Sequence, residues 1–164
     1  MFAPRTWVVG EVVSAAIMNQ EIRDQLNTLL AAWTPYTPTW TASTNPNIGN
    51  GTLTGRYMKI GRTVIVHINL TAGSTTTFGS GSYNWSLPFA AANAGASLVG
   101  TVQILASSRW AGQVVISPNA TTFSIFAPIS SANPRNIDFV TGTAPETLAS
   151  THQIRITFVY ESAT

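Results

Sequence analysis

The sequence contains no cysteine, and this absence excludes disulfide bonds, thiolate metal ligands and a cysteine nucleophile while leaving the redox compartment open. Charged residues are scarce as well, at 9% of the 164 residues, compared with roughly 25% in typical soluble domains. Hydrophobic residues make up 45%, so the composition is not that of a disordered chain. A surface this poor in charge is typical of a protein that covers area in an oligomer. The alternative is a β domain with neutral surfaces.

Long apolar runs and targeting signals are also missing. No apolar stretch reaches the roughly 20 residues that a membrane-spanning helix needs, so we expect no membrane partner. Met1 is followed by Phe-Ala-Pro-Arg, with no apolar run or small-residue cleavage site, so we expect no signal peptide. The chain is therefore expected to be soluble and made in a cytoplasm.

Positive charge is present but thinly spread. The formal net charge is +2 and the isoelectric point is near 9.4. The densest basic cluster consists of Arg56, Lys59 and Arg62. Nucleic-acid-binding proteins carry more charge, gathered on one face, so we expect no nucleic-acid partner.

Few titratable groups are available for catalysis. Asp138 and Glu146 share a loop region and form the one carboxylate pair that glycoside hydrolysis could use, although solvated loop charges are the simpler interpretation. His67 and His152 lie on expected strands without metal-ligand spacing, although His67 could repeat around the axis of a trimer. The segment GNGTLTG lacks the lysine of a phosphate-binding loop, and no Gly-x-Ser-x-Gly motif is present. We predict no enzyme, no cofactor and no metal site.

The N-terminal 33 residues are unlike the rest of the chain. The arm over residues 1–13 holds Trp7 and four valines, which is too apolar to remain in water, so it is expected to pack on another surface. Pro4 and Gly10 argue against a helix in the arm. Ser14 is a good N-cap, and the pattern after it predicts the only helix of the chain, over residues 15–32.

One face of this predicted helix has the 3-4 spacing of a short coiled-coil seam. Its positions are Ala15, Asn19, Ile22, Leu26, Leu29 and Trp33. Asn19 falls at an a position, where a buried asparagine sets the register. We interpret this seam, together with Trp7, as an oligomerisation and attachment element. The alternative is a single amphipathic helix lying on its own β domain.

Everything after the helix predicts strands and turns. Pro35 and Pro38 stop the helix, and Tyr36 and Trp40 are expected to anchor the first strand, with a sugar-binding platform as the alternative. After turn-rich residues 44–56, the pattern predicts strands at residues 56–60, 63–71, 83–88, 98–106, 109–117, 121–127, 137–140 and 152–161. The predicted fold is mainly β: an antiparallel β-sandwich of jelly-roll type preceded by one helix. The predicted domains are an arm and helix over residues 1–35 and a head over residues 36–164.

Two segments carry a resemblance to a known family: GEVVSAAIMNQEIRDQLNTLL, and the run from YTPTWT through GNGTLTGRY to FGSGSYNWSLP. Over residues 7–90 the chain resembles small structural proteins encoded by tailed phages of actinobacteria. The resemblance implies a trimeric virion protein with an N-terminal attachment helix, located in the virion as a minor tail or tail-fibre protein and contacting other virion proteins. No catalytic residues carry over, because the motif belongs to a scaffold.

Three functional classes follow from these observations. The first is a trimeric tail appendage whose head binds a host cell-surface glycan, the second is a trimer that decorates the capsid, and the third is a free carbohydrate-binding module. The apolar arm favours the first two, because a free module does not need it. For a glycan, the candidate residues are Tyr83, Trp85, Trp110 and Asn133, with core or interface packing as the alternative for the tryptophans.

Overall fold

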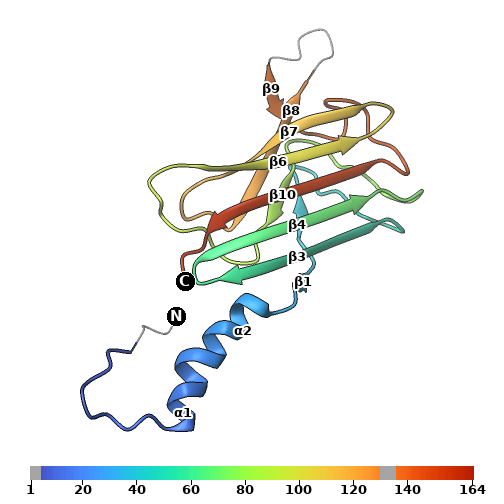
Figure 1. Cartoon of the computed structure of the whole chain (residues 1–164). Coiled ribbons are helices and arrows are strands. Elements are labelled where there is room, and N and C mark those ends of the chain that lie inside the picture. Colours follow the sequence, from blue (N-terminus) through green and yellow to red (C-terminus); the bar gives the residue numbers. More distant parts are fainter. Residues whose placement is uncertain (1–4, 130–135) are drawn as a thin grey trace.

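The computed structural model describes residues 5–129 and 136–164, which form a β-rich body with a helix projecting from it (Figure 1). The helix begins with α1 (Ala15–Met18), continues as a π-helical segment (Asn19–Arg23) and ends with α2 (Asp24–Leu30). The Ile17 amide donates to the Ser14 hydroxyl oxygen at 3.3 Å, which confirms Ser14 as the N-cap. The helix stops two residues earlier than predicted, because Ala31 is already extended at ψ 144°.

The π-helical segment was not predicted, and it changes the face that the helix presents. The amide of Asp24 bonds to the carbonyl of Asn19, five residues back. Such a turn is wider than an α-helical turn, so it moves Asn19 further around the helix from the stripe formed by Ile22, Leu26 and Leu29. The seam is therefore not the uniform heptad that a straight α-helix gives.

The described residues contain ten strands, against about eight predicted. They are β1 (Thr34–Tyr36), β2 (Trp40–Thr41), β3 (Thr52–Ile60), β4 (Thr63–Thr71), β5 (Asn84–Ser86), β6 (Leu98–Leu105), β7 (Arg109–Ile116), β8 (Thr122–Pro128), β9 (Ile137–Phe139) and β10 (Gln153–Glu161). The prediction of turns over residues 44–56 is wrong from Thr52 onward, since Thr52 to Gly55 pair with β4 as part of β3.

The strands form one curled antiparallel sheet in the order β1-β3-β4-β10-β6-β7-β8-β5-β2, with β9 paired to β8. The two ends of this path, β1 and β2, are separated in the chain only by residues 37–39. The four steps from Tyr36 to Trp40 span at most about 14 Å, so the sheet must curl until its edges are close together. The curl encloses the core between two facing halves, which confirms the mainly β, sandwich-like fold.

Alternation along β4 and β10 fills that core. Val64, Val66, Ile68 and Leu70 are buried, as predicted, while His67 between them faces outward. In β10 the buried partners are Ile154, Ile156, Phe158 and Tyr160. Because β10 pairs with both β4 and β6, these side chains lie at the centre of the sheet.

An aromatic cluster closes the core beneath β2 and β5. The rings of Trp40 and Trp85 are stacked at 6.2 Å between centroids, and Tyr83 meets Trp40 edge-on at 5.0 Å. Trp85 also stacks on Phe123 at 5.9 Å. These contacts join the link after the helix to the body, so the segment from Tyr36 to Trp40 is the structural junction that the sequence favoured over a sugar-binding platform.

Candidate functional site

Exposed apolar side chains gather on the arm and helix. Of the fifteen large hydrophobic residues that are exposed in the described chain, ten lie between Trp7 and Leu30. They are Trp7, Val8, Val9, Val12, Val13, Met18, Ile22, Leu26, Leu29 and Leu30. Neither α1 nor the π-helical segment has a buried residue. We call residues 5–30 the apolar arm–helix surface.

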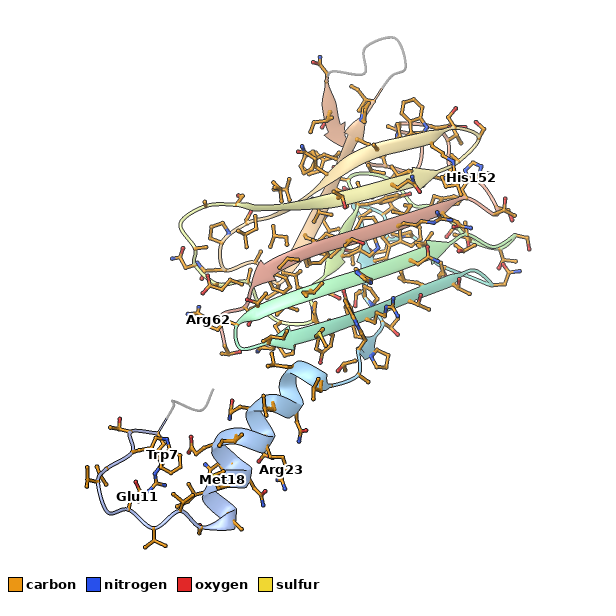
Figure 2. All side chains as sticks on the ribbon, in the orientation of Figure 1. Trp7, Glu11, Met18, Arg23, Arg62 and His152 are labelled. Atoms are coloured by element: carbon orange, nitrogen blue, oxygen red, sulfur yellow. The ribbon has the colours of Figure 1, made fainter. Side chains whose placement is uncertain are left out.

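The arm loops back beside the helix and pairs its own charges (Figure 2). The Arg5 guanidinium forms an ion pair with Glu11, and the Arg5 amide donates to the Glu21 carboxylate at 3.4 Å. The Arg5 guanidinium also lies 5.8 Å from the centre of the Trp7 ring. These contacts join the arm to the helix, and the arm–helix surface exposes polar side chains beside the apolar ones, among them the Arg23–Asp24 ion pair.

Within the described residues, the main contact between helix and body lies where α2 approaches β3 (Figure 1). Trp33 lies beyond the helix rather than on it. Its indole stacks on the His67 imidazole at 4.5 Å between centroids, and the Arg56 guanidinium lies 5.1 Å from the ring centre. The prediction that Trp33 continues the helical seam is therefore wrong, because the chain becomes extended at Ala31 and carries the indole onto the sheet.

The residues predicted to bind a glycan do not form one site. Tyr83 and Trp85 are fully buried in the aromatic cluster, so the core-packing alternative is correct for Trp85, and neither side chain is exposed to a glycan. Trp110 is half-buried, and its indole N–H donates to Glu146 at 3.0 Å. Asn133 lies outside the described residues.

Glu146 is bound by the turn between β6 and β7. Its carboxylate accepts hydrogen bonds from the Ser107 hydroxyl, the Trp110 indole and the amides of Ser107 and Ser108, the amides at 3.2 and 3.3 Å. These bonds, the Ser107 hydroxyl first, lower the pKa of Glu146 from 4.5 to about 2. A general acid needs a raised pKa, so the lowered pKa of Glu146 does not suit the acid of a glycosidase pair.

Neither a metal-ligand cluster nor a membrane-spanning helix is present in the described residues. No group of three or more histidine, aspartate or glutamate side chains in residues 5–129 and 136–164 is close enough to hold a metal ion. In the same residues, no helix combines the length and apolar character that crossing a membrane requires.

A groove on the outer face of the sheet was missed by the sequence analysis. It has a volume of about 570 Å³ and lies over β3, β4 and β10 beside Pro35. Its polar lining residues are Thr54, Arg56, His67, Asn69, Arg155 and Thr157. Alternation places His67 and Arg155 on the outward faces of their strands, but only the pairing of β4 with β10 shows that they share one surface.

Comparison with known proteins identifies no relative of this chain. No protein-family model matches the chain, and neither a curated protein nor a solved structure does.

Proposed function

We propose that this chain is a structural assembly protein in which the apolar arm–helix surface binds copies of the same chain and the β body is presented outward. The observation that carries the proposal is the ten exposed large apolar side chains between Trp7 and Leu30. A concentration of exposed apolar side chains of this kind is a mark of protein–protein contact.

The helix needs such a partner for its own stability. A helix of about 15 residues is marginal in water unless its apolar face packs against another element. In the described chain the helix packs on neither the sheet nor a second helix, apart from the contact at the end of α2. The exposed fractions of Ile22, Leu26 and Leu29 are 44%, 50% and 49%, so each has a large part of its side chain left to bury. Self-association supplies that burial.

The sequence resemblance supports a more specific proposal. The likeness of residues 7–90 to actinobacteriophage structural proteins favours a trimer in the virion, placed in the tail as a minor tail or tail-fibre protein. There the arm and helix bind other virion proteins, and the body meets the host surface. Capsid decoration by the same trimer is the second candidate. The free carbohydrate-binding module is disfavoured, because such a module does not use the arm–helix surface.

Removal of the arm and helix tests the assembly role. A variant that lacks residues 1–32 keeps Trp33, whose stacking on His67 belongs to the body. We expect light scattering to give a trimer for the full chain and a monomer for this variant. A variant that remains trimeric would show that assembly uses the body instead.

The location in the virion needs a separate experiment. Particles labelled with an antibody against the β body are imaged by electron microscopy. Label at the tail supports the tail proposal, and label over the capsid supports decoration. Particles that carry no label, in a lysate that contains the protein, contradict both.

A further inference from the structure

The outer-face groove (Pro35, Thr54, Arg56, His67, Asn69, Arg155 and Thr157) is distinct from the arm–helix surface. Strand register gathers its polar residues into two rows across the sheet. Arg56 lies opposite His67, and His67 lies opposite Thr157. In the next row Asn69 lies opposite Arg155. Arg56 and Arg155 lie on the two strands that flank β4 and in different rows, so their Cα atoms stand about 12 Å apart, diagonally across the sheet.

Neither arginine is neutralised. The ion pairs of the described residues are Arg5 with Glu11, Arg23 with Asp24 and Arg62 with Glu161, so no carboxylate in the described chain pairs with Arg56 or Arg155. Of the two other described carboxylates on the body, that of Glu146 is occupied by the turn after β6, and that of Asp138 accepts the Phe139 amide at 2.7 Å. The groove therefore carries uncompensated positive charge.

Polar and aromatic side chains contact both guanidinium groups. Arg155 donates from Nε and Nη2 to the Gln153 amide oxygen at 3.0 and 2.7 Å, and from Nη1 to that of Gln103 at 3.3 Å. Arg56 lies over the Trp33 ring, with Nη2 3.5 Å from Nδ1 of His67. Fixed guanidinium groups lose less freedom when they bind, and their planar N–H groups match carboxylate and phosphate oxygens.

We propose that the groove binds an oxyanion, either a carboxylate or a phosphate, between Arg56 and Arg155. A volume of about 570 Å³ falls within the range of ligand sites, roughly 300 to 1,000 Å³, and exceeds what one small ion needs. The groove thus has room for the rest of a molecule that carries the acidic group. Asn69 and Thr157 add polar side chains between the arginines.

The test is calorimetric titration of the full chain at constant ionic strength. The probes are inorganic phosphate, a glycerol-phosphate oligomer, an oligogalacturonate and the neutral trisaccharide maltotriose. We expect the acidic probes to bind and maltotriose not to bind. Equal affinity for free phosphate and the phosphate oligomer identifies free phosphate as the source, whereas tighter binding of an oligomer identifies a group borne on a larger molecule. Absence of binding by every acidic probe overturns the proposal, as does equal binding of maltotriose.

Three glutamine variants locate the site. Arg56→Gln and Arg155→Gln should each weaken binding about tenfold, the loss expected when one hydrogen-bonded charge is removed. Arg109→Gln makes the same charge change on β7, outside the groove lining, and should leave affinity unchanged. Equal weakening by all three variants would show that only net charge matters, and would overturn the site.

A second readout does not depend on the variants. In a nuclear magnetic resonance titration, the side-chain signals of His67 and Asn69 should shift on ligand addition. Shifts confined to another part of the sheet contradict the proposal. Oxyanion binding is measured by titration of the full chain, whereas self-assembly is measured by molecular mass. Failure of one proposal therefore does not contradict the other.

Discussion

Replacing Leu26 and Leu29 by serine should dissociate the proposed trimer without unfolding the body. The exposed fractions of these side chains are 50% and 49%, so about half of each remains to be covered by a partner. Full burial of a leucine contributes roughly 1.5–3 kcal/mol, so covering the exposed half contributes about 0.7–1.5 kcal/mol at each position.

The total loss of association free energy is larger than the loss per chain, because each substitution is present in all three chains of the trimer. Two positions in each of three chains give about 4–9 kcal/mol for the trimer, which lowers its association constant by roughly a thousandfold to a millionfold. Serine leaves no large cavity in the body, because both residues lie on α2, outside the core. The unfolding temperature of the β body should therefore stay constant while the trimer dissociates.

Sedimentation equilibrium over a range of protein concentrations measures this effect. Val159→Ser is the matched control, because Val159 is also aliphatic and 51% exposed, yet lies on β10 of the body. The reasoning is refuted if the double variant assembles at the same concentration as the unmodified chain, or if Val159→Ser dissociates the trimer to the same extent. In either case the exposed leucines of α2 do not form the contact.

Three further predictions concern the body. The pKa of Glu146 is lowered from 4.5 to about 2, so its ionised form stabilises the fold fully above pH 4.5 and this contribution is lost as the pH falls to 2. Unfolding temperatures measured between pH 4.5 and 2 should therefore fall for the natural chain and fall less for Glu146→Gln. Parallel curves for the two proteins would contradict the role of the carboxylate. Trp85→Ala should lower the free energy of unfolding in urea by about 3–5 kcal/mol, since the indole is fully buried, and a loss under 1 kcal/mol would be inconsistent with that burial. Gly55→Ala should lower the free energy of unfolding by about 1–3 kcal/mol in the same measurement, because a Cβ atom there would lie 2.6 Å from the Tyr36 ring. The loss should be smaller when Tyr36 is also replaced by alanine. An unchanged loss in that double variant would show that the clash involves another group.

Features of the fold that are encoded by neighbouring residues were predicted correctly from the sequence. Alternation in Val64 to Leu70 reflects one buried face of a strand, and the structure buries those residues. Ser14 caps the helix because its hydroxyl reaches an amide three residues on. In both cases the pattern that carries the prediction lies in neighbouring residues, so the sequence nearby was sufficient to predict it.

Features decided by distant pairing were missed. Thr52 to Gly55 have turn chemistry, yet pairing with β4 holds them in β3, and their local preference is overridden. For Trp85 the sequence left core packing and glycan binding open, and it is the pairing of β5 with β8 that brings the indole onto Phe123 in the core. The outer-face groove was not predicted for the same reason. Arg56 and Arg155 are brought onto one surface only because their strands both pair with β4.

The short link between helix and body has a mechanical consequence. Only the residues from Ala31 to Trp33 separate the end of α2 from β1, and Trp33 is itself stacked on His67. The chain then passes through β1 and a buried Pro38 to reach the core at Trp40. So short a link leaves the body little travel relative to the helix. If a partner binds the helix as proposed, the position of the body is therefore set to within the reach of these three residues.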